Sequence, residues 1–313
     1  MAQRQQRFLQ RSTAFPRFAI HCSTNPILRR HIQSDTMSCE GTALPVSSSV
    51  EPELHADQER LYQDVLRLLA EHPVAYAVSG AFALQEHTGV RRPAKDLDIF
   101  LTSETAVLAL DVLSKYGFRC EVCDPVWLAK AHRDDFFVDL ITGMSNAAVT
   151  VTDSWITRAR PSVILGVPTR ILAAEELLAS KLFVVRRERF DGADIAHIIY
   201  GTRGRLEWSR ILELAGAHWE MLLWALVLFR YIYPAQSHYV PLPVWTQLVN
   251  QLVHRLLNPD PSARFRGSLV DENMFAIDVK EWGLDDLLSE YRACRARNIR
   301  WPSDTVEANE GAA

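Results

Sequence analysis

Apolar and polar positions alternate along the chain in a pattern that predicts strands and helices in mixed order. From residue 51, apolar residues recur at helical spacing to about residue 71, and Pro52 suits the start of that helix. Short apolar runs typical of buried strands follow at 74–78, 96–101, 118–122 and 136–142, with helices expected at 81–86 and 104–116. This order predicts an α/β domain with a mixed sheet.

The pattern changes to helices from about residue 168. Residues 173–189 carry an apolar stripe, residues 208–233 are apolar nearly all round, and a further helix is expected at 244–257. The most apolar run, 221–229, ends at Arg230, whereas a membrane-spanning helix needs about 20 residues. We therefore expect a helical C-terminal domain with a buried helix, and no membrane segment.

The two ends of the chain differ in composition from the rest. Residues 1–36 contain six arginines and one acidic residue, and residues 38–50 are polar and rich in serine. Such a segment is typical of an organelle transit peptide; the alternatives are a disordered tail, or an upstream start codon with Met37 as the true start. No secretory signal is expected. The predicted division is a tail at 1–50, an α/β domain at 51–167, a helical domain at 168–300 and a disordered tail at 301–313.

Composition narrows the classes of function. The chain has 313 residues, is 48% hydrophobic and carries a net charge of −4, which fits a folded protein with a sizeable core. This charge argues against a protein that coats nucleic acid, but leaves room for a local basic groove. Five cysteines make no disulfide scaffold and fit reduced thiols, so we expect a cytoplasmic location.

A first candidate site is the turn Val78-Ser79-Gly80-Ala81, where a predicted strand passes directly into a helix. Such a turn offers backbone N–H groups and a positive helix end to a phosphate. Glycine in a strand–turn–helix connection is also a common structural feature, so this turn alone does not decide the function.

Three acidic residues form the second candidate. Asp96 and Asp98 share one face of a predicted strand, roughly 6–7 Å apart at ~3.3 Å per residue. A bound cation would offset their repulsion, and oxygen ligands favour Mg²⁺ or Mn²⁺; a solvent-exposed edge strand is the alternative. Asp139 lies within an apolar run and needs a partner. If the two strands are neighbours, the three carboxylates make a two-metal centre for phosphoryl transfer.

Residues 78–100 and 139 carry a family resemblance. The Gly80 turn, the Asp96-Leu97-Asp98 strand and the later third aspartate resemble the signature of the polymerase-beta-like nucleotidyltransferase superfamily. The closer likeness is to bacterial nucleotidyltransferases of the abortive-infection toxin type and their uncharacterised relatives. It extends over about residues 61–199, through Asp139-Leu140-Ile141, the helix motif at 176–181 and an R…D…D stretch at 189–194. Two positions depart from the pattern of this family: Ala81 stands where the family has a second Gly or Ser, and Ala94 stands where it has a Thr.

The resemblance implies a role for each matching residue. Asp96 and Asp98 would hold two Mg²⁺ or Mn²⁺ ions, and Asp139 would bind one ion and orient the acceptor hydroxyl. Ser79, Gly80 and the N–H of Ala81 would hold the phosphates. Arg92 would contact the triphosphate or position the loop. Lys181 would reach a phosphate or the base of the nucleotide. For Lys181 a solvated helix position is the alternative.

The resemblance also implies an activity, namely transfer of a nucleoside monophosphate from a nucleoside triphosphate (NTP) to a hydroxyl, with release of pyrophosphate. Candidate acceptors are tRNA or another RNA, a small molecule and a protein side chain, and a cognate antitoxin or regulator is a candidate partner. The alternative is a non-catalytic nucleotide- or partner-binding module on the same fold, which the departures at Ala81 and Ala94 leave open.

Other motifs favour no further chemistry. His132-Arg133-Asp134 is similar to a kinase catalytic loop, but Asp139 stands where that loop requires Asn, and no glycine-rich loop precedes it; we expect a loop here. Cys120 and Cys123 would face opposite sides of a strand and so not share a zinc ion. Arginines between residues 186 and 205 could steer RNA or triphosphate, or form a solvated helix face.

Overall fold

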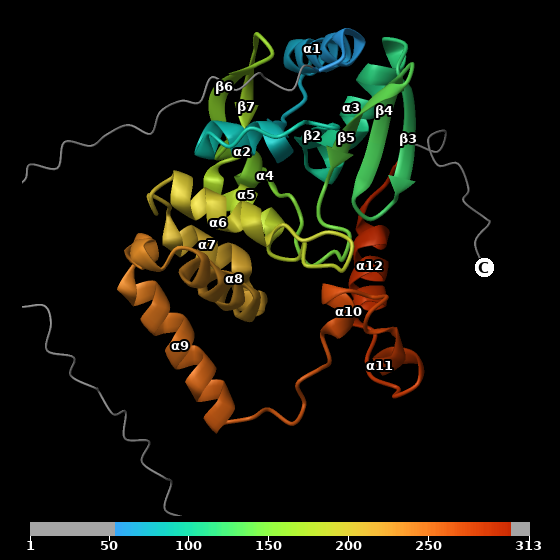
Figure 1. Cartoon of the computed structure of the whole chain (residues 1–313). Helices are drawn as coiled ribbons and strands as arrows, with labels where there is room; N and C mark the ends of the chain where they lie inside the picture. Colours follow the sequence, from blue (N-terminus) through green and yellow to red (C-terminus); the bar gives the residue numbers. More distant parts are fainter. Residues whose placement is uncertain (1–53, 302–313) are drawn as a thin grey trace, which may run out of the picture. The chain divides into compact units, whose positions relative to one another are not determined.

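A computed structural model of the protein describes residues 54–301, and its central element is a seven-stranded sheet with the order β3-β4-β5-β2-β1-β7-β6 (Figure 1). The strands are β1 Ala77–Val78, β2 Leu97–Phe100, β3 Arg119–Asp124, β4 Leu128–Arg133, β5 Phe136–Ile141, β6 Arg160–Ile164 and β7 Val167–Ile171. Strand β2 is parallel to β5 and β1 is parallel to β7, whereas the other neighbours are antiparallel. The predicted mixed α/β fold with helices after it is therefore confirmed. The predictions for residues 1–50 and 302–313 lie outside the described residues.

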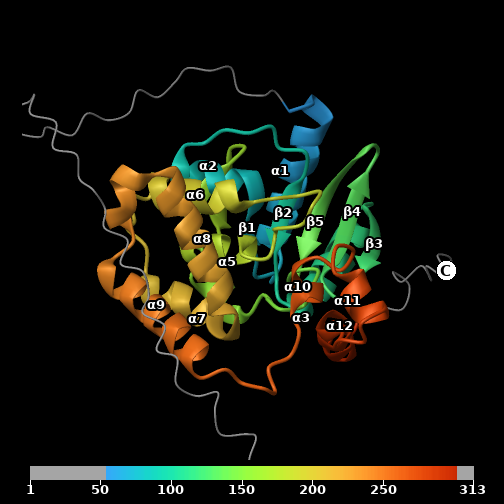
Figure 2. The same cartoon turned by 60° about the horizontal axis from the view of Figure 1, so that its bottom comes forward.

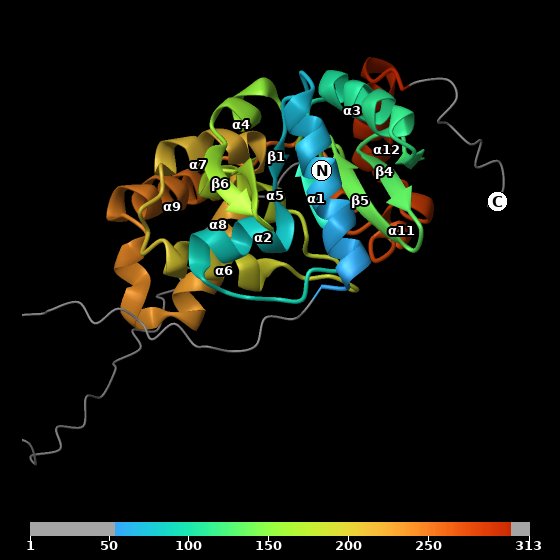
Figure 3. The ribbon, with the colours of Figure 1, turned by 90° about the horizontal axis from the view of Figure 1, so that it is seen from above.

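The central strands β2 and β5 are held in register by their apolar residues. Leu97 pairs with Val138 and Ile99 with Leu140, and all four side chains are fully buried. Helices α1 (Ala56–Glu71) and α3 (Ser103–Lys115) pack together near these strands, and Figure 3 looks directly onto α1. Because side chains alternate along a strand, this register places Asp98 and Asp139 together on the opposite face.

Three strands were not predicted, because their sequences mix polar residues into the apolar ones. Strand β4 reads LAKAHR, and β6 and β7 read RPSVI and VPTRI. The expected loop at His132-Arg133-Asp134 is wrong for its first two residues, which end β4; Asp134, at φ 54°, begins the turn into β5. Strand β7 runs through the predicted boundary at residue 167 and pairs with β1, while the division into two domains stays a prediction.

Two helices of the second half are shorter than predicted. Helix α5 ends at Lys181, before a loop closed by pairing of Val185 with Phe190, instead of continuing to residue 189. The long helix expected at 208–233 breaks at Gly216, whose φ is 46°, into α7 and α8. The helices here are α4 Asp153–Thr157, α5 Ala174–Lys181, α6 Gly192–Gly201, α7 Trp208–Ala215, α8 Trp219–Ile232, α9 Leu242–Leu257, α10 Gly267–Val270, α11 Ala276–Lys280 and α12 Leu287–Asn298. Figure 2 shows α10, α11 and α12 grouped on the side of the sheet formed by β3–β5.

The apolar run through α7 and α8 is long enough to be compared with a membrane span. Trp208–Ile232 has 25 residues and is long and apolar enough to cross a membrane. The core helix of a soluble protein can have the same length and composition. Leu222, Leu226 and Phe229 of α8 are fully buried, and α8 contacts α6 and α9. The absence of a membrane segment therefore stays a prediction.

A buried ion cluster joins α5 to α7. Glu176, which is completely buried, accepts from Arg210 at 2.9 Å and lies 3.1 Å from Arg158. We expect Glu176→Ala to lower the free energy of unfolding by ~3–5 kcal/mol, because it removes the buried carboxylate that pairs with both Arg210 and Arg158. Glu213→Ala, which removes the exposed partner of the same arginine, should cost at most ~1 kcal/mol. Denaturant unfolding of both variants tests this, and equal losses would contradict it.

Candidate active site

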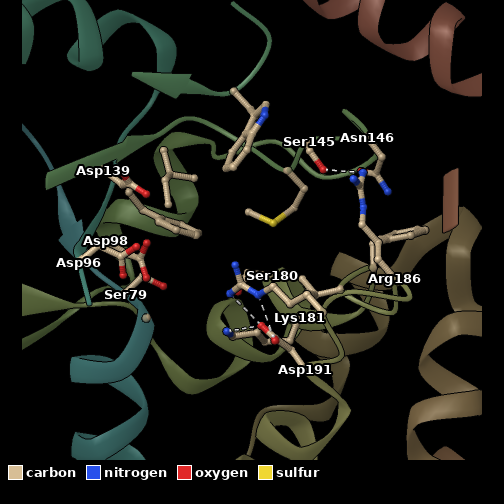
Figure 4. A pocket seen from close by; sticks show the side chains of 18 residues that line it. Ser79, Asp96, Asp98, Asp139, Ser145, Asn146, Ser180, Lys181, Arg186 and Asp191 are labelled. Atoms are coloured by element: carbon tan, nitrogen blue, oxygen red, sulfur yellow. Dashed lines mark hydrogen bonds and ion pairs between the residues drawn. The ribbon is translucent and has the colours of Figure 1, made fainter. Parts of the chain in front are cut away.

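The three predicted carboxylates meet on the face of the sheet opposite to the side chains of Leu97 and Ile99. Asp98 and Asp139 are direct neighbours on the parallel strands β2 and β5, and Asp96 lies just before β2, which starts at Leu97. Each residue offers an oxygen atom, and these atoms lie within 4.8 Å of one another. Strand β2 lies between β5 and β1, so the alternative of an exposed edge strand is wrong. Figure 4 shows the three aspartates on the same side of a cavity as Ser79.

The turn at Ser79-Gly80 packs directly against Asp98. The N–H of Ser79 donates to the carbonyl of Asp98 at 2.8 Å, and α2 (Gly80–Thr88) begins at the next residue. Gly80 has φ of 61°, and a Cβ atom at this position would overlap with Oδ2 of Asp98. Ala81 lies in the first turn of α2, and the side chain of Ser79 does not cap this helix. The helix N-terminus therefore offers its backbone N–H groups beside the carboxylates, as phosphate binding requires.

The environment of the carboxylates disfavours their charge. Burial, followed by repulsion from Asp96 and Asp139, raises the pKa of Asp98 to about 7, against the opposing effect of Lys181 and Arg189. Burial also raises the pKa of Asp139, opposed by Lys130. Carboxylates with a raised pKa that line a cavity are typical of functional sites.

These residues fit a divalent cation. Oδ1 of Asp139 is buried, and the ammonium of Lys130 lies 2.8 Å from it. The donor set is three carboxylates, whose oxygen atoms are the ligands that Mg²⁺ and Mn²⁺ prefer. A bound divalent cation would offset the repulsion from Asp96 and Asp139 that contributes to the raised pKa of Asp98.

The raised pKa of Asp98 predicts how stability depends on pH without metal. The folded protein keeps this proton up to about pH 7, whereas an aspartate in the unfolded chain loses its proton near pH 4. Between these values the folded state binds more protons, so the free energy of unfolding falls as pH rises from about 4 to 7. We expect a loss of ~2–4 kcal/mol across this range in EDTA, and a smaller loss in Asp98→Asn. Denaturant unfolding at pH 4 and pH 8 measures this loss; an equal loss of stability in both proteins would contradict the assignment.

Basic side chains line the cavity opposite the carboxylates. Lys181, at the end of α5, is nearly buried and pairs with Asp191 at 2.6 Å and Asp194 at 3.1 Å. The alternative of a solvated position for Lys181 is therefore wrong. Arg189, which also lines the cavity, pairs with Asp191 at 3.1 Å. Arg92 does not line this cavity, but pairs with Asp194 behind it.

The cavity has a volume of about 310 Å³, and apolar side chains line the part of it next to the carboxylates. Phe100 and Ile141 each follow a site aspartate by two residues, and Trp127 and Met144 lie beside them. The indole N–H of Trp127 donates to Asp124 at 3.0 Å, and Arg292 of α12 holds Asp124 through two bonds of 3.1 and 3.0 Å. These bonds fix the indole, so this half of the cavity can receive a flat ring or an apolar group of a substrate.

Sequence reasoning missed two residues at this site, Trp127 and Lys130. Trp127 lines the cavity, and Lys130 of β4 lies 2.8 Å from Asp139. The sequence of β4, LAKAHR, did contain a signal for Lys130. Buried alanines alternate with polar residues in it, as in a strand that has one face in the core and one face toward polar groups. Its partner could not be identified without the strand order.

Comparisons with known proteins identify a family. The sequence profile of the family described as "Nucleotidyl transferase of unknown function (DUF2204)" matches residues 58–217, just over half of the chain. No curated protein matches the chain significantly.

Solved structures of nucleotidyltransferases are distantly similar. The antibiotic-resistance factor ANT(2'')-Ia has 18% identity over 58% of this chain and 96% of its own, with a TM-score of 0.36. The lincosamide antibiotic adenylyltransferase LnuA has 18% identity over 45% and 95%, with a TM-score of 0.33. An antigenic nucleotidyltransferase-like protein from Paracoccidioides brasiliensis has 17% identity over 60% and 95%, with a TM-score of 0.38. The match to the family profile confirms the predicted relationship to nucleotidyltransferases. This chain therefore belongs to the nucleotidyl transferase family DUF2204.

Proposed function

We propose that the protein is a metal-dependent nucleotidyltransferase that moves a nucleoside monophosphate from an NTP to an acceptor hydroxyl and releases pyrophosphate. The observation that carries this proposal is the convergence of Asp96, Asp98 and Asp139 within 4.8 Å, beside the glycine turn that starts α2. Carboxylates that could hold two ions, next to a phosphate-binding helix end, are the arrangement that phosphoryl transfer requires.

Each residue has a role in this reaction. Asp96 and Asp98 would hold two Mg²⁺ or Mn²⁺ ions and Asp139 one of them; bound ions supply positive charge that stabilises the phosphoryl transition state. The N–H groups of Gly80 and Ala81 would bind the β- and γ-phosphates, with Lys181 and Arg189 opposite. Asp139 would orient the acceptor hydroxyl and accept its proton. The hydroxyl oxygen bonds to the α-phosphorus as the bond to pyrophosphate breaks.

The proposal also covers the acceptor, a partner protein and the cellular location. RNA 3′ ends, including tRNA, small molecules and protein side chains remain the candidate acceptors, and the likeness to abortive-infection toxins would add a cognate antitoxin. A cytoplasmic location agrees with Cys120, Cys123 and Cys294, which are free thiols in the described part of the chain.

Incubation with each of four NTPs labelled at the α-phosphate, with Mg²⁺, tests the proposal and finds the acceptor. Parallel reactions contain total cellular RNA, a small-molecule extract, or the cellular proteins. We expect label in one pool, with an equal amount of pyrophosphate, and none with Asp98→Asn. Stabilisation by Mg²⁺–NTP with no label in any pool would support the non-catalytic nucleotide-binding module instead.

A further inference from the structure

One row of charged residues crosses four strands of the sheet on the face of the active site. Glu121 of β3 lies opposite Lys130 of β4, Lys130 lies opposite Asp139 of β5, and Asp139 lies opposite Asp98 of β2. Residues directly opposite in neighbouring strands point to the same face. The only cation of this row is therefore next to the carboxylate that completes the candidate metal site.

Lys130 is fixed in this position from two sides. Its ammonium lies 2.8 Å from Oδ1 of Asp139, and the side chains are only 20% and 12% exposed. The same ammonium lies over the ring of Phe137, 3.6 Å from its centroid. At 2.8 Å the ammonium and the carboxylate form a close ion pair.

The oxygen that Lys130 contacts belongs to the group that would bind a divalent ion. Two cations at one buried carboxylate repel each other, and the repulsion is little screened where water is scarce. The phosphates of a nucleotide would bring several negative charges to the same place and offset it. Lys130 should therefore oppose metal binding most strongly when no nucleotide is present.

We propose that Lys130 is a resident cation that competes with the divalent ion at Asp139 and makes metal loading depend on bound nucleotide. This inference rests on the proposed function, since it assumes that the three carboxylates hold metal. Lys130 does not line the cavity, so it acts through Asp139 as a positioning residue. It also compensates the charge of Asp139 in the metal-free protein, where that carboxylate would otherwise be buried without a cation.

The test is titration with Mn²⁺ alone, followed by electron paramagnetic resonance, on the full chain. We expect Lys130→Met to bind Mn²⁺ at least ~10-fold more tightly than the wild type without nucleotide, which corresponds to ~1.4 kcal/mol. With a mixture of non-hydrolysable analogues of the four NTPs, the difference should shrink to less than ~3-fold. Lys130→Arg, which keeps the charge, should resemble the wild type.

Lys115→Met is the matched control, because it removes the same charge from an exposed ion pair with Asp111 on α3. It should leave Mn²⁺ affinity unchanged. Lys130→Gln serves as a second variant, and circular dichroism establishes that each variant is folded.

Two results would overturn the inference in different ways. If wild type binds Mn²⁺ with the analogues but Lys130→Met and Lys130→Gln bind it no more tightly without them, Lys130 only orients Asp139. If no variant binds Mn²⁺ even with the analogues, the metal site of the proposed function fails, and the competition fails with it.

Discussion

Gly80→Ala is expected to reduce nucleotide transfer by at least ~10²-fold, the scale on which metal-based stabilisation of a transition state is lost. The added Cβ would overlap with Oδ2 of Asp98, so the carboxylate must leave its position in the site. The backbone at Gly80 also has φ of 61°, which disfavours alanine. Steady-state transfer of label from an α-labelled NTP measures the loss.

Gly89→Ala separates this displacement from backbone strain. Gly89 ends the same helix, α2, with φ of 74°, and a Cβ atom there would meet no atom within 4 Å. This variant should lose ~1 kcal/mol of stability and keep its transfer rate. Equal activity in the two variants would show that the turn at Gly80 does not need to approach Asp98.

Asp98→Asn is expected to lose at least ~10²-fold in transfer and yet be no less stable than the wild type without metal. The metal-free carboxylate is partly buried, and burial together with repulsion from Asp96 and Asp139 raises its pKa to about 7, so removing its charge relieves repulsion at pH 8. The variant should also lose the thermal stabilisation that Mg²⁺–NTP gives the wild type. Such a gain of stability with a loss of function is expected at a functional site.

Thermal melts with and without Mg²⁺–NTP compare these proteins, with Asp111→Asn as the control. Asp111 is exposed on α3 and pairs with Lys115, so its change should affect neither transfer nor the ligand response. A purely structural Asp98 would behave in the opposite way. Lower stability of Asp98→Asn with an unchanged ligand response would contradict the catalytic role.

The parts of the site that follow from local sequence were predictable. Alternation of side chains placed Asp98 on one face of a buried strand, and an acid within six otherwise apolar residues marked Asp139. Whether those two strands are neighbours depends on tertiary packing, which local patterns do not contain. The resemblance to a family supplied that step, and the register Asp98–Asp139 agrees with it.

The other half of the cavity could not be predicted, because its contacts join residues far apart in the chain. Arg292 reaches Asp124 across 168 positions, and this pair fixes Trp127. Strand β4, which carries Lys130, has no continuous apolar run and was overlooked for that reason. The helix predicted at 173–189 was too long, since helical spacing alone did not reveal the turn after Lys181.

The most direct test of the central claim compares two forms of the NTP, one labelled at the α-phosphate and one at the γ-phosphate. Nucleotidyl transfer attaches the α-phosphate to the acceptor and releases the γ-phosphate within pyrophosphate. We expect the α-label alone to appear on the acceptor, and EDTA or Asp98→Asn to prevent this. Appearance of the γ-label on the acceptor, or of neither label although Mg²⁺–NTP binds, would contradict a nucleotidyltransferase.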